Sequence, residues 1–190
     1  MSTDYKKVYD EVYTNSKIYQ ELMDTASNRK YKDPIIFDVV TKHAPKTLVD
    51  LGCGQGHYVR AFRKQLGIDA IGVEVSSHCC EKYLRDIPHH NLDIQSFFKI
   101  APQFEFVFCT DVLEHIDSED ILNVIDGISK LSNKALLGIA NHSDIQCGIE
   151  LHLIRQPASW WVDILSRYYS RVSVLNPLYN GLFFFIECLK

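Results

Sequence analysis

A series of short, continuously apolar segments separated by stretches of helical spacing limits the possible folds more than any other feature of the sequence. An apolar run without alternation is typical of a strand that is covered on both faces. Such runs lie at 47–51, 70–73, 105–109 and 135–140, with a weaker one at 89–92. The stretches between them carry apolar residues at helical spacing, most clearly at 57–66, 76–83 and 121–131. This alternation predicts a parallel sheet between two helical layers.

Both ends of the chain depart from this alternation of predicted strands and helices. Near the end, Val172–Leu175 and Leu182–Ile186 are separated by a loop that contains Asn180 before a glycine, which favours an antiparallel hairpin. Near the start, tyrosines recur every four residues from Tyr5 to Tyr13, so they would share one face of a helix.

Two polar pairs predict where helices begin. Asp33 and Pro34 suit an N-cap and a first helical residue, and Asp117 with Ser118 suits the cap of a later helix. We therefore expect an N-terminal helical lid segment at 1–32 and one α/β domain at 33–190.

The composition argues against several classes of protein. A chain of 190 residues fits one domain, and its net charge of -4 argues against a dedicated nucleic-acid binder. The six cysteines form no CxxC pair, which favours a reduced, cytoplasmic protein. We expect no signal peptide and no membrane span, since the N-terminus has no apolar stretch and the apolar runs are short.

The turn after the first predicted strand carries three glycines in five residues, Gly52, Gly54 and Gly56. They let the backbone turn sharply and approach a ligand closely, at a point where a helix begins. A glycine pattern of this kind also occurs in nicotinamide and flavin sites. Asp50, two residues before the first glycine, would repel a pyrophosphate and would suit a ligand with an ammonium group.

Three further carboxylates follow the next strands. Glu74 stands about twenty residues past the glycine loop, where an acid accepts hydrogen bonds from ribose hydroxyls. Asp93 and Asp111 follow the third and fourth strands. Together with Asp50, these acids predict a crevice for a cationic nucleoside such as S-adenosylmethionine.

The stretches Val49–Gly56 and Asp111–Ile116 resemble the signatures of class I S-adenosylmethionine-dependent methyltransferases. The resemblance covers roughly residues 30 to 190. It implies a Rossmann-like three-layer sandwich with a seven-stranded, mostly parallel sheet in the order 3-2-1-4-5-7-6, whose seventh strand is antiparallel.

The resemblance also implies which residues bind the cofactor. Glu74 would hold the ribose hydroxyls, Val75, Asp93 and Ile94 would meet the adenine, and Tyr31 would close over the carboxylate end. The full set is Asp50, Gly52, Cys53, Gly54, Gly56, Glu74, Val75, Asp93, Ile94, Asp111, Val112 and Tyr31.

The sequence contains fewer motifs that identify residues of the acceptor end. His115 and His152 follow strands four and five, and a histidine near neutral pKa is a suitable general base for a hydroxyl. We expect in-line transfer of the methyl group to an oxygen or nitrogen of a small molecule. The acceptor pocket would form from the tyrosine-rich N-terminus, the loop after strand four and the stretch Asn141–Trp161. In that stretch, one tryptophan should face the core, and Trp160 or Trp161 could stack on the acceptor or simply pack.

Three alternatives remain open from the sequence. The pattern of Asp111, Glu114 and His115 is similar to a motif of metal-dependent RNA 3′-end methyltransferases, in which His142 or His152 could supply a further ligand. This pattern also occurs without metal and the chain lacks a basic surplus, so the main prediction includes no metal and no nucleic acid. A dinucleotide-dependent oxidoreductase and a non-catalytic cofactor-binding module are the other two. The sequence leaves the acceptor's identity and the oligomeric state open.

Overall fold

A computed structural model describes residues 4–21 and 26–190 of the chain. Its main sheet has seven strands in the order β3-β2-β1-β4-β5-β9-β8. These strands are β1 (Thr47–Leu51), β2 (Asp69–Glu74), β3 (His89–Asn91), β4 (Phe106–Thr110), β5 (Lys134–Ala140), β8 (Arg171–Leu178) and β9 (Phe183–Leu189). A separate two-stranded hairpin joins β6 (Ile145–Gln146) to β7 (Ile149–Glu150).

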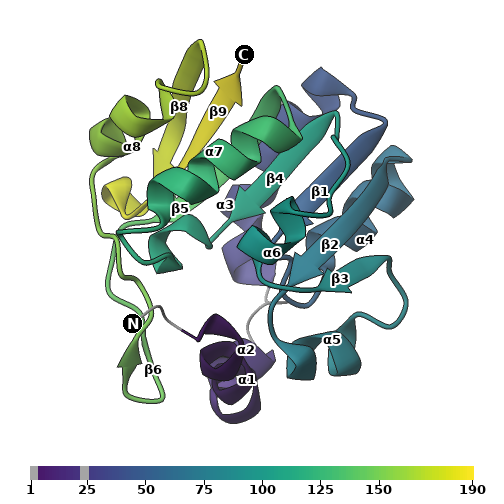
Figure 1. Ribbon diagram of the computed structural model, residues 1–190, viewed down its shortest axis with the longest axis vertical. Helices are drawn as coiled ribbons and strands as arrows, with labels where there is room; N and C mark the ends of the chain where they lie inside the picture. The colour runs from purple at the N-terminus through teal and green to yellow at the C-terminus, as the bar shows by residue number, and fades with distance from the viewer. Residues whose placement is uncertain (1–3, 22–25) are drawn as a thin grey trace.

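The strand directions agree with the predicted fold class. Strands β1 to β5 pair in parallel, while β9 is antiparallel to both of its neighbours, β5 and β8. The predicted order 3-2-1-4-5-7-6 is therefore confirmed, with β8 and β9 as the sixth and seventh strands of the sheet. Because β1 to β5 run in the same direction, their carboxyl ends meet at one edge, which is the lower edge in Figure 1.

Helices cover both faces of the sheet. The apolar core on one face includes residues of α3 (Ala26–His43), α4 (His57–Leu66) and α5 (Ser77–Tyr83). The core on the other face includes residues of α6 (Ile94–Phe98), α7 (Ile121–Leu131) and α8 (Ala158–Leu165). Two short 3-10 helices, η1 (Leu113–His115) and η2 (Tyr179–Gly181), follow β4 and β8. Burial of both sheet faces explains why the strand sequences are continuously apolar.

Two predicted helix starts are wrong. Helix α3 begins at Ala26 and runs through Pro34, and Asp33 accepts a hydrogen bond from the Tyr58 hydroxyl at 2.9 Å instead of capping a helix. Proline has a helix-compatible φ angle, but inside a helix it removes one backbone hydrogen bond and crowds the preceding turn, so its presence favours a helix start without requiring one. The boundary expected between residues 32 and 33 falls inside this helix. Helix α7 begins at Ile121, past the predicted cap at Asp117 and Ser118.

Two segments lie below the carboxyl edge of the sheet. Helices α1 (Tyr5–Asn15) and α2 (Lys17–Glu21) stand beside the β6-β7 hairpin in Figure 1. The Ser16 hydroxyl, buried between α1 and α2, bonds the side chain of Gln146 in the hairpin at 2.8 Å. This bond joins two segments that are 130 residues apart in the sequence.

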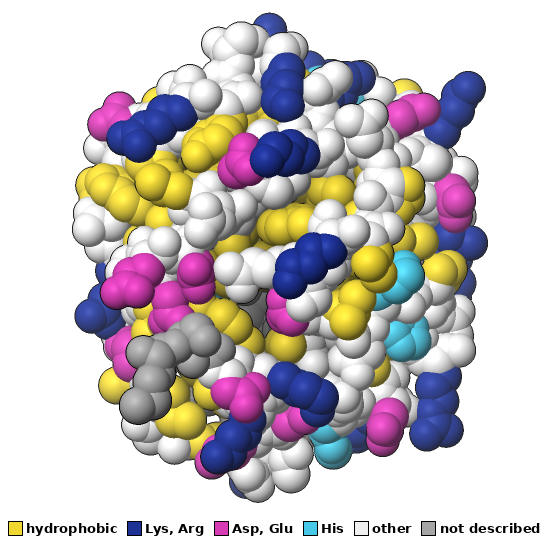
Figure 2. Space-filling model, viewed as in Figure 1, with side chains coloured by type: hydrophobic (Ala, Val, Ile, Leu, Met, Phe, Trp, Pro, Cys, Tyr) yellow, Lys and Arg dark blue, Asp and Glu magenta, His cyan; other side chains and the backbone are white. Residues whose placement is uncertain are grey.

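The surface in the same view carries a mixture of charges. Figure 2 shows lysine and arginine side chains interspersed with aspartate and glutamate over this face, with no broad basic area. No helix within the described residues combines the length and the apolar character that crossing a bilayer requires.

Candidate functional site

A cavity of about 630 Å³ lies between the carboxyl edge of the sheet and the segments below it. Its floor is formed by the loops that follow β1 to β5, and its roof by α1, α2 and the residues that flank the hairpin. Nine of the predicted cofactor residues line it: Asp50, Gly52, Cys53, Glu74, Val75, Asp93, Ile94, Asp111 and Val112.

Gly52 begins the turn after β1 with a φ of 71°, a left-handed conformation that favours glycine. A Cβ atom at this position would also overlap Cγ2 of Val112. The turn is fixed by hydrogen bonds from the Gly52 and Cys53 amides to the Val73 carbonyl, at 2.8 and 3.0 Å. The close approach of Gly52 and Val112 therefore requires glycine here.

The other two glycines act less directly. The Gly54 amide donates a hydrogen bond to Glu74 at 3.0 Å. Gly56 starts α4 with a φ of 76°, and a Cβ there would overlap Ile87 on the side of the core. Both glycines belong to the described chain, and neither lines the cavity. The structure thus places Gly54 and Gly56 behind the cavity wall, where they shape the turn.

Two carboxyl groups are buried at the cofactor end. Asp50 is 2% exposed and Glu74 is 5% exposed, and both line the cavity. Burial raises the pKa of Glu74 to about 7, although backbone amides of Ser76 and Gly54 donate to its oxygens. Burial and the nearby Glu74 raise the pKa of Asp50 well above its usual range. A cationic ligand would favour the ionised form of both groups.

The side chain of Asp93 has two roles. Its side chain accepts a hydrogen bond from the Ser96 amide at 2.8 Å and so caps α6, and it also lines the cavity. The following Ile94 is 9% exposed and lines the cavity beside Val75. These residues form an apolar wall with one carboxylate at the side of β2 and β3.

Asp111 forms an ion pair that the sequence did not reveal. Its φ is 55°, and its two carboxylate oxygens lie 2.8 and 3.1 Å from Nζ of Lys32 in α3. Burial opposes ionisation, but Lys32 and the Thr110 hydroxyl lower the pKa of Asp111 below its usual range. The Lys32 ammonium also stands 3.7 Å from the centre of the Phe183 ring. Lys32 is the one lysine or arginine among the cavity-lining residues that the structure describes.

Tyr31 does not reach the site. It is 52% exposed, its ring contacts Tyr179 at 6.1 Å between centroids, and within the described residues it is not part of the cavity wall. Adjacent helical residues point about 100° apart, so the presence of Lys32 in the cavity directs Tyr31 away.

Three histidines gather at the acceptor end. The rings of His115 and His152 meet edge to face with centroids 4.6 Å apart, and His142 lies 4.9 Å from His152. His152 Nδ1 lies 2.6 Å from the His142 carbonyl, so this nitrogen carries the proton and donates it. Burial lowers the pKa of His152, and burial and His152 lower that of His115 to about 3. Both rings are therefore neutral at pH 7.

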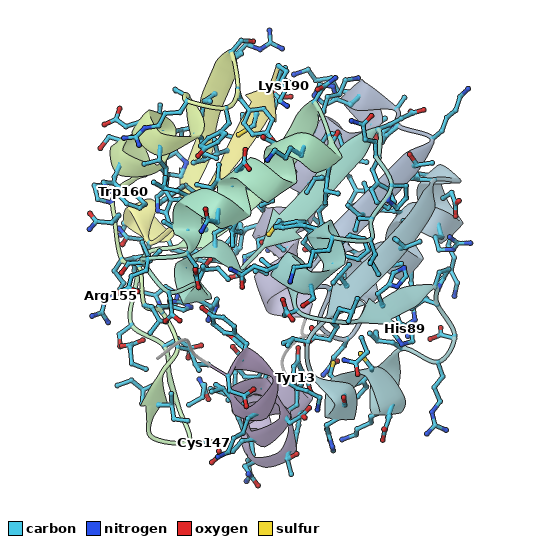
Figure 3. The ribbon with its side chains drawn as sticks, in the orientation of Figure 1. Tyr13, His89, Cys147, Arg155, Trp160 and Lys190 are labelled. Atoms are coloured by element: carbon cyan, nitrogen blue, oxygen red, sulfur yellow. The ribbon has the colours of Figure 1, made fainter. Side chains whose placement is uncertain are left out.

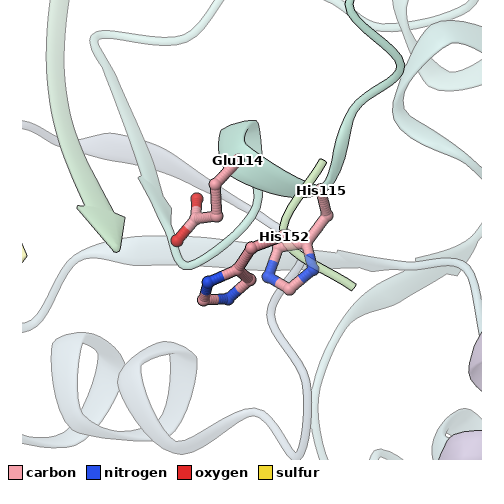
Figure 4. Close-up of side chains that lie close together, drawn as sticks. All are labelled: Glu114, His115 and His152. Carbon is pink, nitrogen blue, oxygen red and sulfur yellow. The ribbon is translucent and has the colours of Figure 1, made fainter. Parts of the chain in front are cut away.

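Glu114 is fully buried beside this pair. Its Oε1 accepts a hydrogen bond from the Ala140 amide at 2.7 Å, whereas Oε2 and the Nδ1 of His115 have no partner among the described residues. Burial and the nearby Asp111 raise the pKa of Glu114 to about 8. Figure 4 shows the side chains of Glu114, His115 and His152 lying close together. Sequence reasoning noted Glu114 in a motif but did not place it in the site.

Tyrosines of the N-terminal helices close the cavity. Tyr5, Tyr9 and Tyr13 line it from one face of α1, as their spacing predicted, and Tyr19 lines it from α2. Tyr9 lies 6.0 Å from the ring of His115, edge to face. The roof therefore contacts the histidine cluster directly.

The tryptophan pair does not contribute to the cavity. Trp161 is fully buried in the core, and Trp160 packs against it at 5.0 Å between ring centroids. Both belong to the described chain, and neither lines the cavity. Figure 3 shows Trp160 on α8, well away from Tyr13 and from Cys147 at the hairpin tip. One tryptophan faces the core as predicted, and the other packs instead of stacking on an acceptor.

Comparison with known proteins gives one family. The sequence matches the family model described as methyltransferase domain over residues 20–173. No protein of curated function matches the sequence.

Solved structures share the fold at low sequence identity. Magnesium protoporphyrin IX methyltransferase (ChlM) from Synechocystis PCC 6803, with bound SAM, is 15% identical with a TM-score of 0.69, over 100% of this chain and 98% of that one. The DhpI-SAM-HEP complex is 12% identical with a TM-score of 0.70, over all of both chains. The N-terminal domain of EvdMO1, in the presence of SAH and D-fucose, is 12% identical with a TM-score of 0.64, over 83% of this chain and 81% of that one.

Proposed function

The chain belongs to the methyltransferase domain family, and we propose that it transfers a methyl group from S-adenosylmethionine to an oxygen or nitrogen of a small, uncharged acceptor. One observation carries the choice of donor. Asp50 and Glu74 are buried carboxyl groups that line the cavity beside the tight turn at Gly52. A sulfonium nucleoside favours the ionised form of these buried carboxyl groups, whereas the pyrophosphate of a dinucleotide would oppose it. The solved neighbours that hold SAM or SAH in the same fold support this choice.

The cofactor end offers a partner for each part of S-adenosylmethionine. Glu74 accepts hydrogen bonds from the ribose hydroxyls, since each of its oxygens has a lone pair left beyond its bond to a backbone amide. Val75, Ile94 and Asp93 form the adenine wall.

The Lys32–Asp111 pair matches the methionine end of the donor. Its two side chains present opposite charges 2.8 Å apart in the cavity wall, which complement the carboxylate and the ammonium of an amino acid. Lys32 therefore takes the role for which the sequence suggested Tyr31. Asp50 adds a second carboxyl group near the same end.

His152 and His115 act at the acceptor end. Because His152 Nδ1 donates to the His142 carbonyl, the lone pair of the ring is on Nε2, which has no hydrogen bond to the described residues. Nε2 takes the proton of the acceptor hydroxyl as the S–CH3 bond breaks and the O–CH3 bond forms. Alignment of the three reacting atoms supplies most of the rate enhancement. Tyr9 and Tyr19 in the roof limit access of water.

The lining supports an uncharged acceptor. His115 and His152 are neutral, Lys32 is already paired with Asp111, and Ile18, Leu182 and Phe183 add apolar surface. This arrangement disfavours the RNA acceptor that the sequence left open, because phosphate binding needs unpaired cations. The D-fucose present with the EvdMO1 domain is consistent with a small-molecule acceptor.

Calorimetric titration tests the donor. The full chain should bind S-adenosylmethionine and S-adenosylhomocysteine at one per chain and should not bind NAD; tight NAD binding alone would refute the proposal. Glu74→Ala should weaken S-adenosylmethionine binding by about 1.5–3 kcal/mol, the scale for a lost charged hydrogen-bond partner. The matched control is Asp69→Asn at the opposite, exposed end of the same strand, which should leave affinity unchanged.

Label transfer tests the reaction. S-Adenosylmethionine with a labelled methyl group should label at least one member of a panel of sugars, phenols and other small alcohols or amines. Binding of the donor without transfer to any member would instead favour a cofactor-binding module.

A further inference from the structure

Three coordinating atoms at the acceptor end are left without partners. Glu114 Oε2 and His115 Nδ1 are buried and have no hydrogen bond among the described residues, and His152 Nε2 has none either. One ligand atom from each residue lies within 4.8 Å of the other two. A buried polar atom without a hydrogen bond destabilises the folded chain. The cluster therefore needs an explanation: His115 and His152 line the cavity, and Glu114 is buried directly behind them.

The second polar atom of Glu114 and that of His152 are held by the backbone. Glu114 Oε1 accepts from the Ala140 amide at 2.7 Å, and His152 Nδ1 donates to the His142 carbonyl at 2.6 Å. The backbone of Leu151 lies beside the His115 ring and favours its protonated form. Backbone contacts of this kind orient the free atom of a ligating side chain and are typical around protein-bound metals.

We propose that Glu114, His115 and His152 bind a divalent transition-metal ion at the acceptor end of the cavity. Two imidazoles with one carboxylate suit zinc, manganese, iron or cobalt, and three protein ligands leave coordination positions open. Asp111, which the sequence motif placed with Glu114 and His115, is held by Lys32 instead. The proposal departs from the metal-free prediction made from the sequence.

The ion would define the class of acceptor. This part of the inference rests on the proposed methyl transfer. An acceptor hydroxyl that binds the ion loses its proton more readily, because the metal stabilises the alkoxide. The proton passes to water, the S–CH3 bond breaks, the O–CH3 bond forms, and S-adenosylhomocysteine leaves. His152 then serves as a ligand and does not take the proton. With more than one open position, the ion favours an alcohol or phenol that has a second oxygen on the neighbouring carbon.

Cobalt(II) alone is the probe for the site. The full chain, stripped with a chelator and dialysed, should bind one Co²⁺ per chain in calorimetry and show visible d–d absorption. Glu114→Gln keeps the side-chain volume and the bond to Ala140, and should weaken Co²⁺ binding at least 100-fold, as should His115→Ala. Two control variants, His89→Ala on β3 and Cys147→Ser on the exposed hairpin tip, should bind as the parent does.

The outcomes separate the two proposals. Absence of stoichiometric Co²⁺ binding, or binding that survives both Glu114→Gln and His115→Ala in folded protein, overturns the metal site. Full methylation by chelator-stripped enzyme also overturns it and leaves the methyltransferase proposal intact. Thermal melting and S-adenosylmethionine affinity establish that each variant is folded. A chain that binds Co²⁺ at this cluster but no S-adenosylmethionine would refute the proposed donor alone.

Discussion

The two ends of the cavity are built in different ways. The cofactor end consists of loops that directly follow β1 to β4, whose parallel register fixes their relative positions. The acceptor end is assembled from α1, α2, η1 and the segment around the β6-β7 hairpin, joined by contacts such as Ser16 to Gln146. A backbone turn determines the first end, whereas side-chain contacts between distant segments determine the second. Substitutions at the two ends should therefore have separable effects.

The largest expected effect is on turnover at the acceptor end. His152→Ala removes a side chain that activates the acceptor hydroxyl, as its base or, with the proposed ion bound, as a ligand of that ion, so kcat should fall at least about 100-fold. S-Adenosylmethionine affinity by calorimetry should stay within about twofold of the parent. A variant with full turnover would remove His152 from the mechanism, and one with weakened donor binding would show that the ends are not separable.

The second-largest effect is expected from a substitution at the cofactor end. Gly52→Ala forces a side chain into a left-handed turn and against Val112, each costing about 1–3 kcal/mol. We expect the midpoint of urea unfolding to fall and S-adenosylmethionine affinity to drop about 100-fold. Gly67→Ala is the matched control, because its φ is 66° but a Cβ there has open space. It should lose stability through strain alone, with donor affinity unchanged.

A smaller effect should follow from opening the roof. Ser16→Ala removes the buried bond to Gln146, which is worth about 1 kcal/mol. The KM for the acceptor should rise about fivefold in steady-state kinetics, while the Kd for the donor should change less. Equal changes in the two constants would mean that α1 and α2 serve both ends alike.

The smallest effect on the cavity is expected at the opposite edge of the sheet. Glu187 in β9 bonds Lys42 at 2.8 Å and His43 at 2.7 Å. Burial would raise the pKa of Glu187, but these bonds outweigh it and hold the pKa below its usual range.

A carboxyl group with a lowered pKa stabilises the fold above its unfolded-state pKa of about 4.3 and loses that contribution as the pH falls. Glu187→Gln should thus lower the free energy of unfolding by about 1–3 kcal/mol at pH 7 and less at pH 3, in urea titrations. Donor and acceptor constants should not change. A changed constant would mean that the far edge influences the cavity.

The same contrast explains what the sequence could predict. Local patterns predicted the strands, the glycine turn at Gly52 and the acids Asp50 and Glu74. Each of these features lies within or directly after a short apolar run that marks a strand. Lys32 was missed because its partner Asp111 lies 79 residues away and no local pattern connects them. The start of α3 was missed because Asp33 and Pro34 have the residue types of an N-cap and a first helical position, whereas both residues lie inside the helix. The strand order required the resemblance to a known family, and the structure confirmed it.

Helix α1 is tied to α5 through Asp10, which accepts from the Ser76 hydroxyl at 2.7 Å and from the His78 amide at 3.1 Å. Tyr5, Tyr9 and Tyr13 of this helix line the cavity. In the proposed reaction, S-adenosylhomocysteine and the methylated product would leave past α1, and the rate at which this helix moves would set an upper limit on kcat.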